Sequence, residues 1–274
     1  MAEDTQPRIA LNDGNTMPQM GFGVWQIAAN ETAAMVRGAL MAGYRSFDAA
    51  AIYGNEEGVG AGIEDRTDVF ITTKVWNTDQ GFDETLRAFE ASAKRMRRET
   101  VDLYLIHWPS PHRNRFVETW KALIRLKETG QAKSIGVSNF TAEHLERIIG
   151  ETGIVPAVNQ IELHPQFQQT ALRAFHAAHS IQTEAWSPLG RGKLTGNPVI
   201  AGLAAKHGKT PAQIILRWHL DSGSIVIPRS VNAVHRRENF AALSFRLEAT
   251  DLARIAALDR PDGRTGPDPV TAEF

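Results

Sequence analysis

The sequence predicts an α/β fold, a barrel of parallel strands formed by a single domain over residues 1–274. A length of 274 residues lies within the range of one α/β barrel and allows a sizeable core. Short β-rich runs alternate with segments of helical periodicity, a pattern that favours parallel strands. No linker-like or low-complexity stretch marks a second domain.

Eight β-rich runs follow one another along the chain. They are Gly21–Gly23, Arg45–Asp48, Val69–Lys74, Val101–His107, Ser134–Ser138, Ala157–Ile161, Gln182–Ala185 and Ser224–Pro228. Ahead of them, Ile9–Met17 contains an Asp13-Gly14 pair typical of a β-hairpin turn, and this hairpin is expected to close one end of the barrel. The tail from Arg260, which contains Pro and Gly, is predicted to be a surface loop.

Between the runs, apolar residues recur at helical spacing, as around Trp120 and Ile148. One helix start is well marked, because Thr210 offers an N-cap, Pro211 suits the first turn and Gln213 completes a capping box. These signals support the alternation of strands and helices.

Composition excludes several classes of function. Lys and Arg number 30 against 31 Asp and Glu, so a net charge of −1 provides no field for nucleic acid or an anionic membrane. The absence of cysteine excludes disulfides, thiolate nucleophiles and cysteine-based metal sites. Met1–Pro7 is polar without a following apolar segment, and no run is long enough to span a bilayer. We therefore expect a cytoplasmic protein.

Three familiar motifs are incomplete. Gly58–Gly62 resembles a dinucleotide fingerprint, but its third glycine comes one position early and no strand immediately precedes it, so we interpret it as a short helix start. Gly136–Phe140 lacks the second glycine of a nucleophile elbow. His176 and His179 lie three apart without a third ligand, which favours solvent-exposed helical histidines and no metal site.

Four polar side chains follow apolar runs, where a parallel barrel gathers its catalytic groups: Asp48, Tyr53, Lys74 and His107. Taken singly, each is also an ordinary turn, cap or core residue. Burying the ammonium of Lys74 is costly unless it is paired, so Lys74 either reaches solvent or meets Asp48. In the second case it would lower the pKa of Tyr53 from about 10, so that the phenol can donate and recover a proton. His107 would then orient the reacting oxygen.

In order and spacing, these four residues and the turn His107-Trp108-Pro109 resemble the catalytic tetrad of the aldo-keto reductases. Similar family motifs occur along the whole chain, among them Gly23–Trp25, Ile135–Phe140, Asn159–Pro165, Trp186–Gly190 and Ile227–Ser230. The loop Trp76–Gly81 and the tail segment Arg264–Pro269 are most similar to bacterial 2,5-diketo-D-gluconate reductases.

The resemblance implies a (β/α)8 TIM barrel that binds NADPH without a Rossmann domain and reduces aldehydes or ketones to alcohols by hydride transfer. Candidate substrates are small dicarbonyls, aromatic aldehydes and keto sugars. In this family Tyr53 would be the general acid, His107 would position the carbonyl, and Lys74 with Asp48 would tune Tyr53. Frequent monomers among relatives imply a monomer here.

The resemblance also implies a set of cofactor contacts. The nicotinamide end would meet Ser138, Asn139, Gln160 and Trp186, the pyrophosphate would follow Ser187, Leu189 and Gly190, and the adenosine end would meet Arg229, Ser230, His235, Glu238 and Asn239. Arg229 replaces the usual lysine and keeps a permanent charge for a 2′-phosphate. His235 replaces an expected arginine, with Arg236 next to it, so NADPH is expected and NADH remains possible.

The aromatic residues Phe22, Trp25, Trp76 and Trp108 would line the substrate mouth. Two other functions stay open at this point. One is a nicotinamide-binding regulatory or structural protein on a reductase-like barrel, because folds outlast activities. The other is a barrel aldolase in which Lys74 forms a Schiff base.

Overall fold

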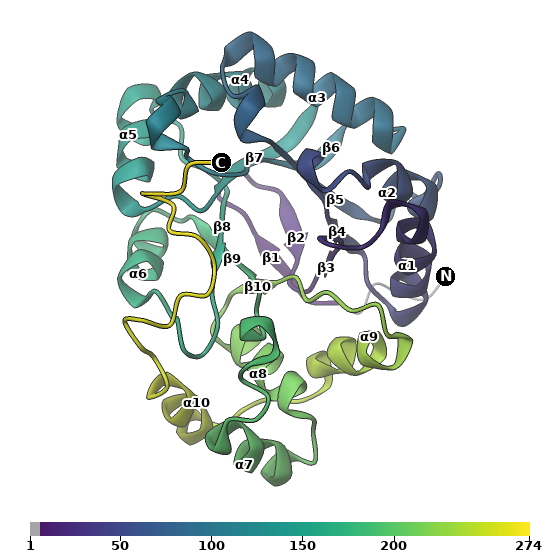
Figure 1. The fold of residues 1–274 in the computed structure, drawn as a ribbon, viewed down its shortest axis with the longest axis vertical. Coiled ribbons are helices and arrows are strands. Elements are labelled where there is room, and N and C mark those ends of the chain that lie inside the picture. The colour runs from purple at the N-terminus through teal and green to yellow at the C-terminus, as the bar shows by residue number, and fades with distance from the viewer. Residues whose placement is uncertain (1–5) are drawn as a thin grey trace.

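The computed structural model describes residues 6–274; Met1–Thr5, part of the segment in which no secretory signal was expected, lie outside the described residues. Eight parallel strands form a ring surrounded by helices (Figure 1). In order around the ring they are β3 (Phe22–Gly23), β4 (Ser46–Asp48), β5 (Phe70–Val75), β6 (Val101–Ile106), β7 (Ala132–Ser138), β8 (Val158–Glu162), β9 (Gln182–Trp186) and β10 (Ile225–Val226). Each predicted run therefore contains one observed strand or most of it.

The ring is closed by the chain just before β3. Met20 forms a parallel bridge with Val226, and the backbone N–H of Gly21 donates to the Val226 carbonyl at 2.8 Å. Every strand thus has neighbours on both sides, which removes the exposed sheet edges. The predicted (β/α)8 fold is confirmed.

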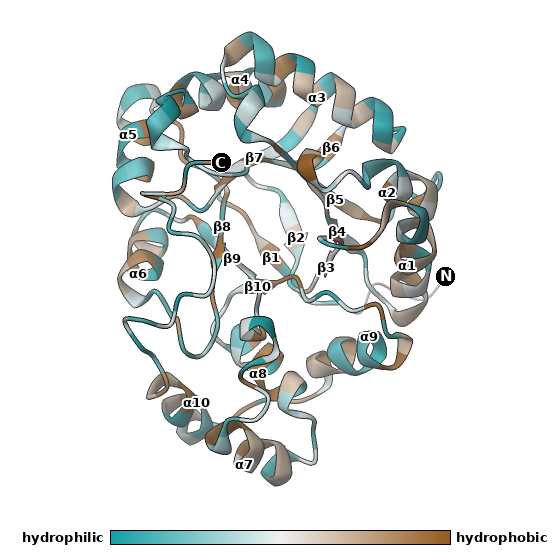
Figure 2. Ribbon diagram, viewed as in Figure 1, coloured by the Kyte–Doolittle hydropathy of each residue, from teal (hydrophilic) through white to brown (hydrophobic). Residues whose placement is uncertain are grey.

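The helices cover the outside of the ring. They are α1 (Ala29–Ala42), α2 (Glu56–Ile63), α3 (Phe82–Met96), α4 (Phe116–Glu128), α5 (Ala142–Thr152), α6 (Thr170–Ala178), α7 (Pro198–His207), α8 (Pro211–Asp221), α9 (Ala233–Phe240) and α10 (Ala249–Ala256). Hydrophilic residues are plentiful on these outer helices (Figure 2), whereas Trp120 and Ile148 are fully buried, as their spacing predicts. The capping box of Thr210 and Gln213 is confirmed at the start of α8.

A two-stranded hairpin closes one end of the ring. Strands β1 (Arg8–Ala10) and β2 (Thr16–Pro18) pair antiparallel around Gly14, whose φ is +87°. Met17 is fully buried and packs in one apolar cluster with residues near the starts of the barrel strands, among them Phe70. The predicted hairpin therefore seals the end of the barrel at which the strands begin.

The glycines of Gly58–Gly62 lie within α2, which begins at Glu56, so they do not mark a helix start. They allow neighbouring helices to approach α2 closely. A Cβ at Gly62 would lie 2.6 Å from Cβ of Val36 on α1, and one at Gly60 would overlap the backbone carbonyl of Met96. The motif serves helix packing.

His176 is not solvent-exposed as expected. It is buried, with its Nε2 2.9 Å from Nδ2 of Asn159 and its Nδ1 2.9 Å from Oγ1 of Thr183. These contacts place Thr183 and Asn159 on the outer, helix-facing side of their strands. Only His179 is exposed, as predicted.

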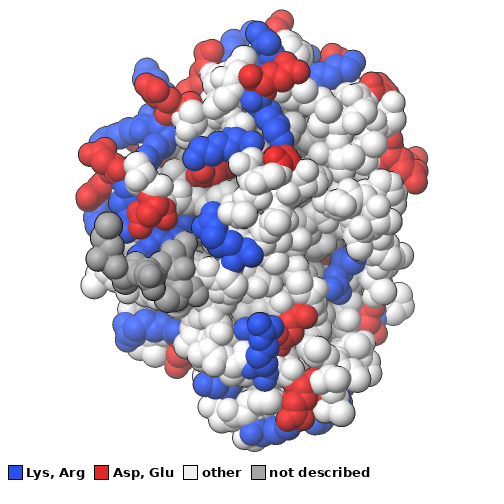
Figure 3. All heavy atoms as spheres, turned by 180° about the vertical axis from the view of Figure 1, so that it is seen from behind, with Lys and Arg blue, Asp and Glu red and all other residues white. Residues whose placement is uncertain are grey.

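The surface carries both signs of charge. On the face seen in Figure 3, acidic and basic side chains are interspersed, in keeping with the net charge of −1. Among residues 6–274, no helix combines the length and apolarity needed to cross a membrane.

Candidate active site

Lys74 lies inside the barrel without exposed surface. Its Nζ donates to both carboxylate oxygens of Asp48 at 2.8 Å and to the carbonyl oxygen of Ala49 at 2.9 Å. Burial alone would lower the pKa of Lys74, but the charge and hydrogen bonds of Asp48, together with the other ionisable neighbours such as Tyr53, outweigh burial and the pKa is raised. Lys74 therefore pairs with Asp48 and does not reach solvent.

The same geometry argues against a Schiff-base role. The three bonds use all three ammonium hydrogens of Lys74, and a protonated amine has no electron pair with which to attack a carbonyl. Lys74 is placed to act as a fixed positive charge.

Tyr53 ends the short 3-10 helix η1 (Ala51–Tyr53), and the Nζ of Lys74 lies 5.2 Å from the centroid of its half-buried ring. Burial raises the pKa of Tyr53 to about 12, although the Lys74 ammonium acts in the opposite direction. The expectation that Lys74 brings this pKa below its usual value is wrong, because loss of water around the phenol outweighs the lysine charge. At neutral pH the phenol therefore carries its proton.

His107 follows β6 and meets Tyr53 edge to face, with ring centroids 5.6 Å apart. Burial, assisted by the Lys74 charge, holds the pKa of His107 well below its usual value, so the imidazole is neutral. Among the described residues, its buried Nδ1 has no hydrogen-bond partner. A neutral imidazole beside a protonated phenol can hold a ligand oxygen between two donors.

The side chains predicted at the nicotinamide end come together at the ends of neighbouring strands. Oγ of Ser138 donates to the backbone carbonyl oxygen of Gln160 at 2.8 Å, and Nδ2 of Asn139 donates to Oγ of Ser138 at 3.0 Å. Trp186 ends β9 and remains half-buried, while its Nε1 donates to Oδ1 of Asn139 at 2.8 Å. The indole is thereby fixed in orientation and keeps exposed surface for a ligand.

The residues predicted for the rest of the cofactor lie after β9 and β10. Ser187 and Gly190 adopt positive φ angles of 48° and 55°, in the turn that also contains the half-buried Leu189. The segment after β10 contains both exposed and buried residues. The cofactor contacts predicted in it are Arg229, Ser230, His235, Glu238 and Asn239. Among these, His235 is exposed and Asn239 is only 4% exposed.

His235 stands where an arginine was expected, and the neighbouring Arg236 does not take over that arginine's place because it has a structural role. Its guanidinium is buried, and Nη1 donates to the carbonyl oxygens of Val231 at 2.9 Å and Ser230 at 3.2 Å. Arg229, by contrast, is exposed and offers its guanidinium to a ligand.

An aromatic group stands over the tetrad. The Trp76 ring packs edge to face on His107 at 5.1 Å and stacks on Phe274 at 5.8 Å. Phe274 also meets Trp108 edge to face at 5.1 Å, and its carbonyl oxygen accepts from Nδ2 of Asn77 at 3.0 Å. Phe274 was not among the predicted mouth residues, because nothing in the local sequence links the tail to these tryptophans.

The other two predicted mouth residues, Trp25 and Phe22, differ in their exposure. Trp25 is 44% exposed and available to a ligand. Phe22 is fully buried and packs on Tyr44 and Phe47, with ring centroids 5.7 and 6.4 Å apart. We therefore leave Phe22 out of the candidate substrate mouth.

The tail from Arg260 is more than a surface loop. Oε1 of Glu162 accepts from the backbone N–H of Thr265 at 2.7 Å and from its hydroxyl at 2.5 Å, and Oε2 accepts from the N–H of Gly266 at 3.0 Å. Burial would raise the pKa of Glu162, but His164, whose Nε2 lies 3.4 Å from Oε1, and the hydrogen bonds from Thr265 and Gly266 lower it to about 2. A Cβ at Gly266 would overlap the Trp186 ring, so the tail passes directly over this residue before reaching Phe274 (Figure 1).

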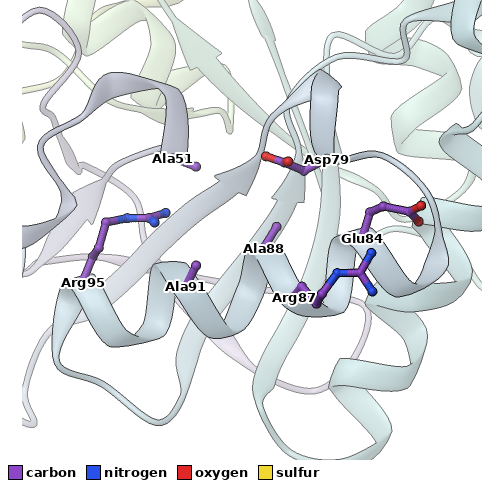
Figure 4. A pocket seen from close by; sticks show the side chains of 7 residues that line it. All are labelled: Ala51, Asp79, Glu84, Arg87, Ala88, Ala91 and Arg95. Carbon is purple, nitrogen blue, oxygen red and sulfur yellow. The ribbon is translucent and has the colours of Figure 1, made fainter.

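A separate hollow of about 310 Å³ opens between α3 and the turns that follow β4 and β5 (Figure 4). Its lining includes Arg87 and Glu84 from α3 and Asp79 on the facing turn. Arg95, also in its wall, is already paired with buried Glu56, with Nη2 2.6 Å from Oε2. Because its charges are mixed and no tetrad residue lines it, we assign no chemistry to this hollow.

The fold and the tetrad together define the class of protein. The chain belongs to the aldo/keto reductase family, whose family model matches residues 19–260.

Individual relatives are similar over nearly the full chain. An aldo-keto reductase of Mycolicibacterium smegmatis is 54% identical, with 98% of both chains covered. The methylglyoxal reductase DkgA of Escherichia coli is 51% identical, covering 95% of this chain and 96% of its own. Among solved structures, a Gox0644 variant in complex with NADPH is 56% identical, with a TM-score of 0.97 over 98% of this chain and 100% of that one.

Proposed function

We propose that this protein uses NADPH to reduce aldehydes or ketones to alcohols, with Tyr53 as the general acid. The observation that carries the proposal is the buried Lys74–Asp48 pair beside the facing rings of Tyr53 and His107. Methylglyoxal is the first substrate to test, because a relative 51% identical is named a methylglyoxal reductase. Aromatic aldehydes and keto sugars are the other candidate classes.

The donor set fits a nicotinamide cofactor. Trp186 offers a flat, half-buried ring, the side chains of Asn139 and Gln160 offer amide groups to a carboxamide, and exposed Arg229 offers a charge to phosphate. When bound, NADPH supplies the hydride. The complex of a similar protein with NADPH supports this choice, and NADH is the alternative.

The residues of the chain would divide the remaining work. Neutral His107 donates an N–H to the carbonyl oxygen and orients it. Tyr53 delivers its proton to that oxygen as negative charge develops there. The Lys74 ammonium stabilises the phenolate that Tyr53 becomes, and Asp48 keeps Lys74 in place and charged.

The test follows NADPH and NADH oxidation by the purified protein with methylglyoxal, an aromatic aldehyde and a keto sugar. Tyr53→Phe keeps the ring and removes the proton, so kcat should fall by roughly 10² to 10⁴ while NADPH still binds. An active Tyr53→Phe variant would refute the assigned mechanism. Tight NADPH binding by the unaltered protein without turnover of any carbonyl would favour the regulatory alternative.

We also propose that the chain is a cytoplasmic monomer with a single domain. The family's frequent monomers support a monomer, the absence of cysteine fits a reducing cytoplasm, and the absence of a linker-like stretch supports one domain. Sedimentation and the number of unfolding transitions would test the oligomeric state and the domain count.

A further inference from the structure

One buried acidic side chain beside the tetrad has no role in the proposed reaction. Glu184 lies in the middle of β9 and is 0% exposed. The preceding residue, Thr183, contacts His176 on α6, so the alternation of strand side chains directs Glu184 into the barrel. Its neighbours in register are Gln160 on β8 and the apolar Ile225 on β10.

Gln160 connects Glu184 to the tetrad. Its Nε2 donates to Oε2 of Glu184 at 2.9 Å and to Oδ1 of Asp48 at 2.8 Å. The same Asp48 oxygen accepts from Nζ of Lys74 at 2.8 Å. Four side chains from four strands therefore form one buried chain of hydrogen bonds.

This arrangement determines what Gln160 can offer a ligand. An amide nitrogen has two hydrogens, and both are used by the two carboxyl groups. Gln160 can then present only its carbonyl oxygen, which accepts from the N–H of a carboxamide. Removing Glu184 would leave one buried amide hydrogen unsatisfied, and the orientation of the amide would be less well fixed.

The charges nearby favour a protonated Glu184. Burial, together with the negative charge of Asp48, raises the pKa of Glu184 to about 8, although Gln160 and the Lys74 ammonium oppose this rise. Among residues 6–274, its second oxygen, Oε1, has no hydrogen-bond partner, and an unpartnered buried oxygen suits a neutral carboxyl group better than a carboxylate. Ionised Glu184 would also raise the pKa of Tyr53 and so hinder its proton donation.

We propose that Glu184 is a positioning residue: a neutral carboxyl group that orients the Gln160 amide and whose ionisation limits carbonyl reduction at alkaline pH. The inference rests on the proposed reductase function and deepens it. It assigns Glu184 to the support of the cofactor contact and of the Asp48–Lys74 pair, without contact with the substrate.

The first experiment measures kcat/KM for methylglyoxal with NADPH from pH 6 to 10. In the unaltered protein we expect activity to fall as the pH rises through about 8. Glu184→Gln keeps the shape and an acceptor oxygen for Gln160 but cannot ionise, so the fall should move up by at least one pH unit. An unshifted alkaline fall in Glu184→Gln would overturn the inference.

Two further variants separate positioning from simple packing. Glu184→Leu removes the acceptor, so NADPH affinity of the protein without substrate should drop about tenfold, while Glu184→Gln keeps it. Thr183→Val is the matched control on the same strand, because Thr183 faces the helices and its loss should leave the pH profile unchanged. Equal NADPH affinity in Glu184→Leu and Glu184→Gln would contradict the orienting role.

A spectroscopic measurement keeps this inference separate from the proposed function. Infrared difference spectra of the protein alone should show a carboxylic-acid C=O stretch that disappears near pH 8 and is absent from Glu184→Gln. No such band would overturn the protonated state of Glu184, even in an active reductase. A different outcome is that the protein shows this band, and weaker NADPH binding in Glu184→Leu, but turns over no carbonyl. That result would support the neutral, orienting state of Glu184 and refute the reductase function.

Discussion

At the scale of single residues, two nearby arginines after β10 have different environments. Arg229 is exposed, and its Nη1 lies 3.4 Å from the carbonyl oxygens of Trp25 and Gln26. Arg236 is buried and holds the backbone of Ser230 and Val231. Of the two, only Arg229 has an exposed guanidinium that can meet a phosphate of the cofactor.

We predict that Arg229→Ala weakens NADPH binding about tenfold or more and leaves NADH binding almost unchanged, because only NADPH carries a 2′-phosphate. Arg236→Ala should instead lower the melting temperature and keep the ratio of the two affinities. Dissociation constants from fluorescence titration and thermal melts check both variants. Equal weakening of both cofactors by Arg229→Ala would mean that Arg229 does not select between them.

How far single residues could be predicted depends on what surrounds them. For Lys74, the sequence left two possibilities open, solvent exposure or pairing with Asp48, and the structure shows the pairing. The pKa of Tyr53 was predicted in the wrong direction, because burial depends on which loops cover the ring. Glu184 could not be singled out in the same way, because its strand, Gln182–Trp186, also contains Gln and Thr, so a further polar residue there gave no sign of burial.

At the scale of elements, the contact between α1, α2 and α3 depends on glycine. Gly60 faces the backbone carbonyl at the end of α3, where no side chain can move aside to admit a Cβ. Gly150 on α5 has no heavy atom within 4 Å of the position a Cβ would take. The two positions form a matched pair, since both are helical glycines.

Gly60→Ala should therefore destabilise the protein by about 1–3 kcal/mol through overpacking. Gly150→Ala should be neutral or stabilise it by up to about 1 kcal/mol, because alanine favours a helix. Urea denaturation of both variants measures the difference. If Gly60→Ala were as stable as Gly150→Ala, the close helix contact would not constrain this site.

Elements with a strong local pattern were predicted well. The eight strands lie within the predicted runs or differ from them by one or two residues at most ends, because each run is bounded by turn or cap signals. The tail was predicted only as a surface loop, since its anchor is Glu162, about a hundred positions earlier in the sequence. Periodicity and propensity carry no information about such distant contacts.

At the scale of the whole molecule, stability should depend on acid pH through buried carboxylates. The pKa of Glu162 is lowered from 4.5 to about 2, a difference worth about 3 kcal/mol. A lowered pKa means that this contribution is complete above pH 4.5 and is lost as the pH falls from there to about 2.

We predict that Glu162→Gln lowers the free energy of unfolding at neutral pH and flattens its decline below pH 4.5. Denaturant titrations at several pH values measure both effects. Glu118→Gln, which removes a surface pair with Lys121, is the control and should leave the curve unchanged. A Glu162→Gln curve parallel to that of the unaltered protein would contradict the prediction.

The hairpin at the start of the chain makes the two ends of the barrel different. It seals the end at which the strands begin, while the tetrad and the aromatic mouth occupy the end at which they finish. The space beside the Gly14 turn is open, although the φ of +87° at Gly14 itself would strain any other residue at that position. A tether attached at this turn would immobilise the catalyst on a solid support with its mouth facing the solution, so that reagents could reach it freely.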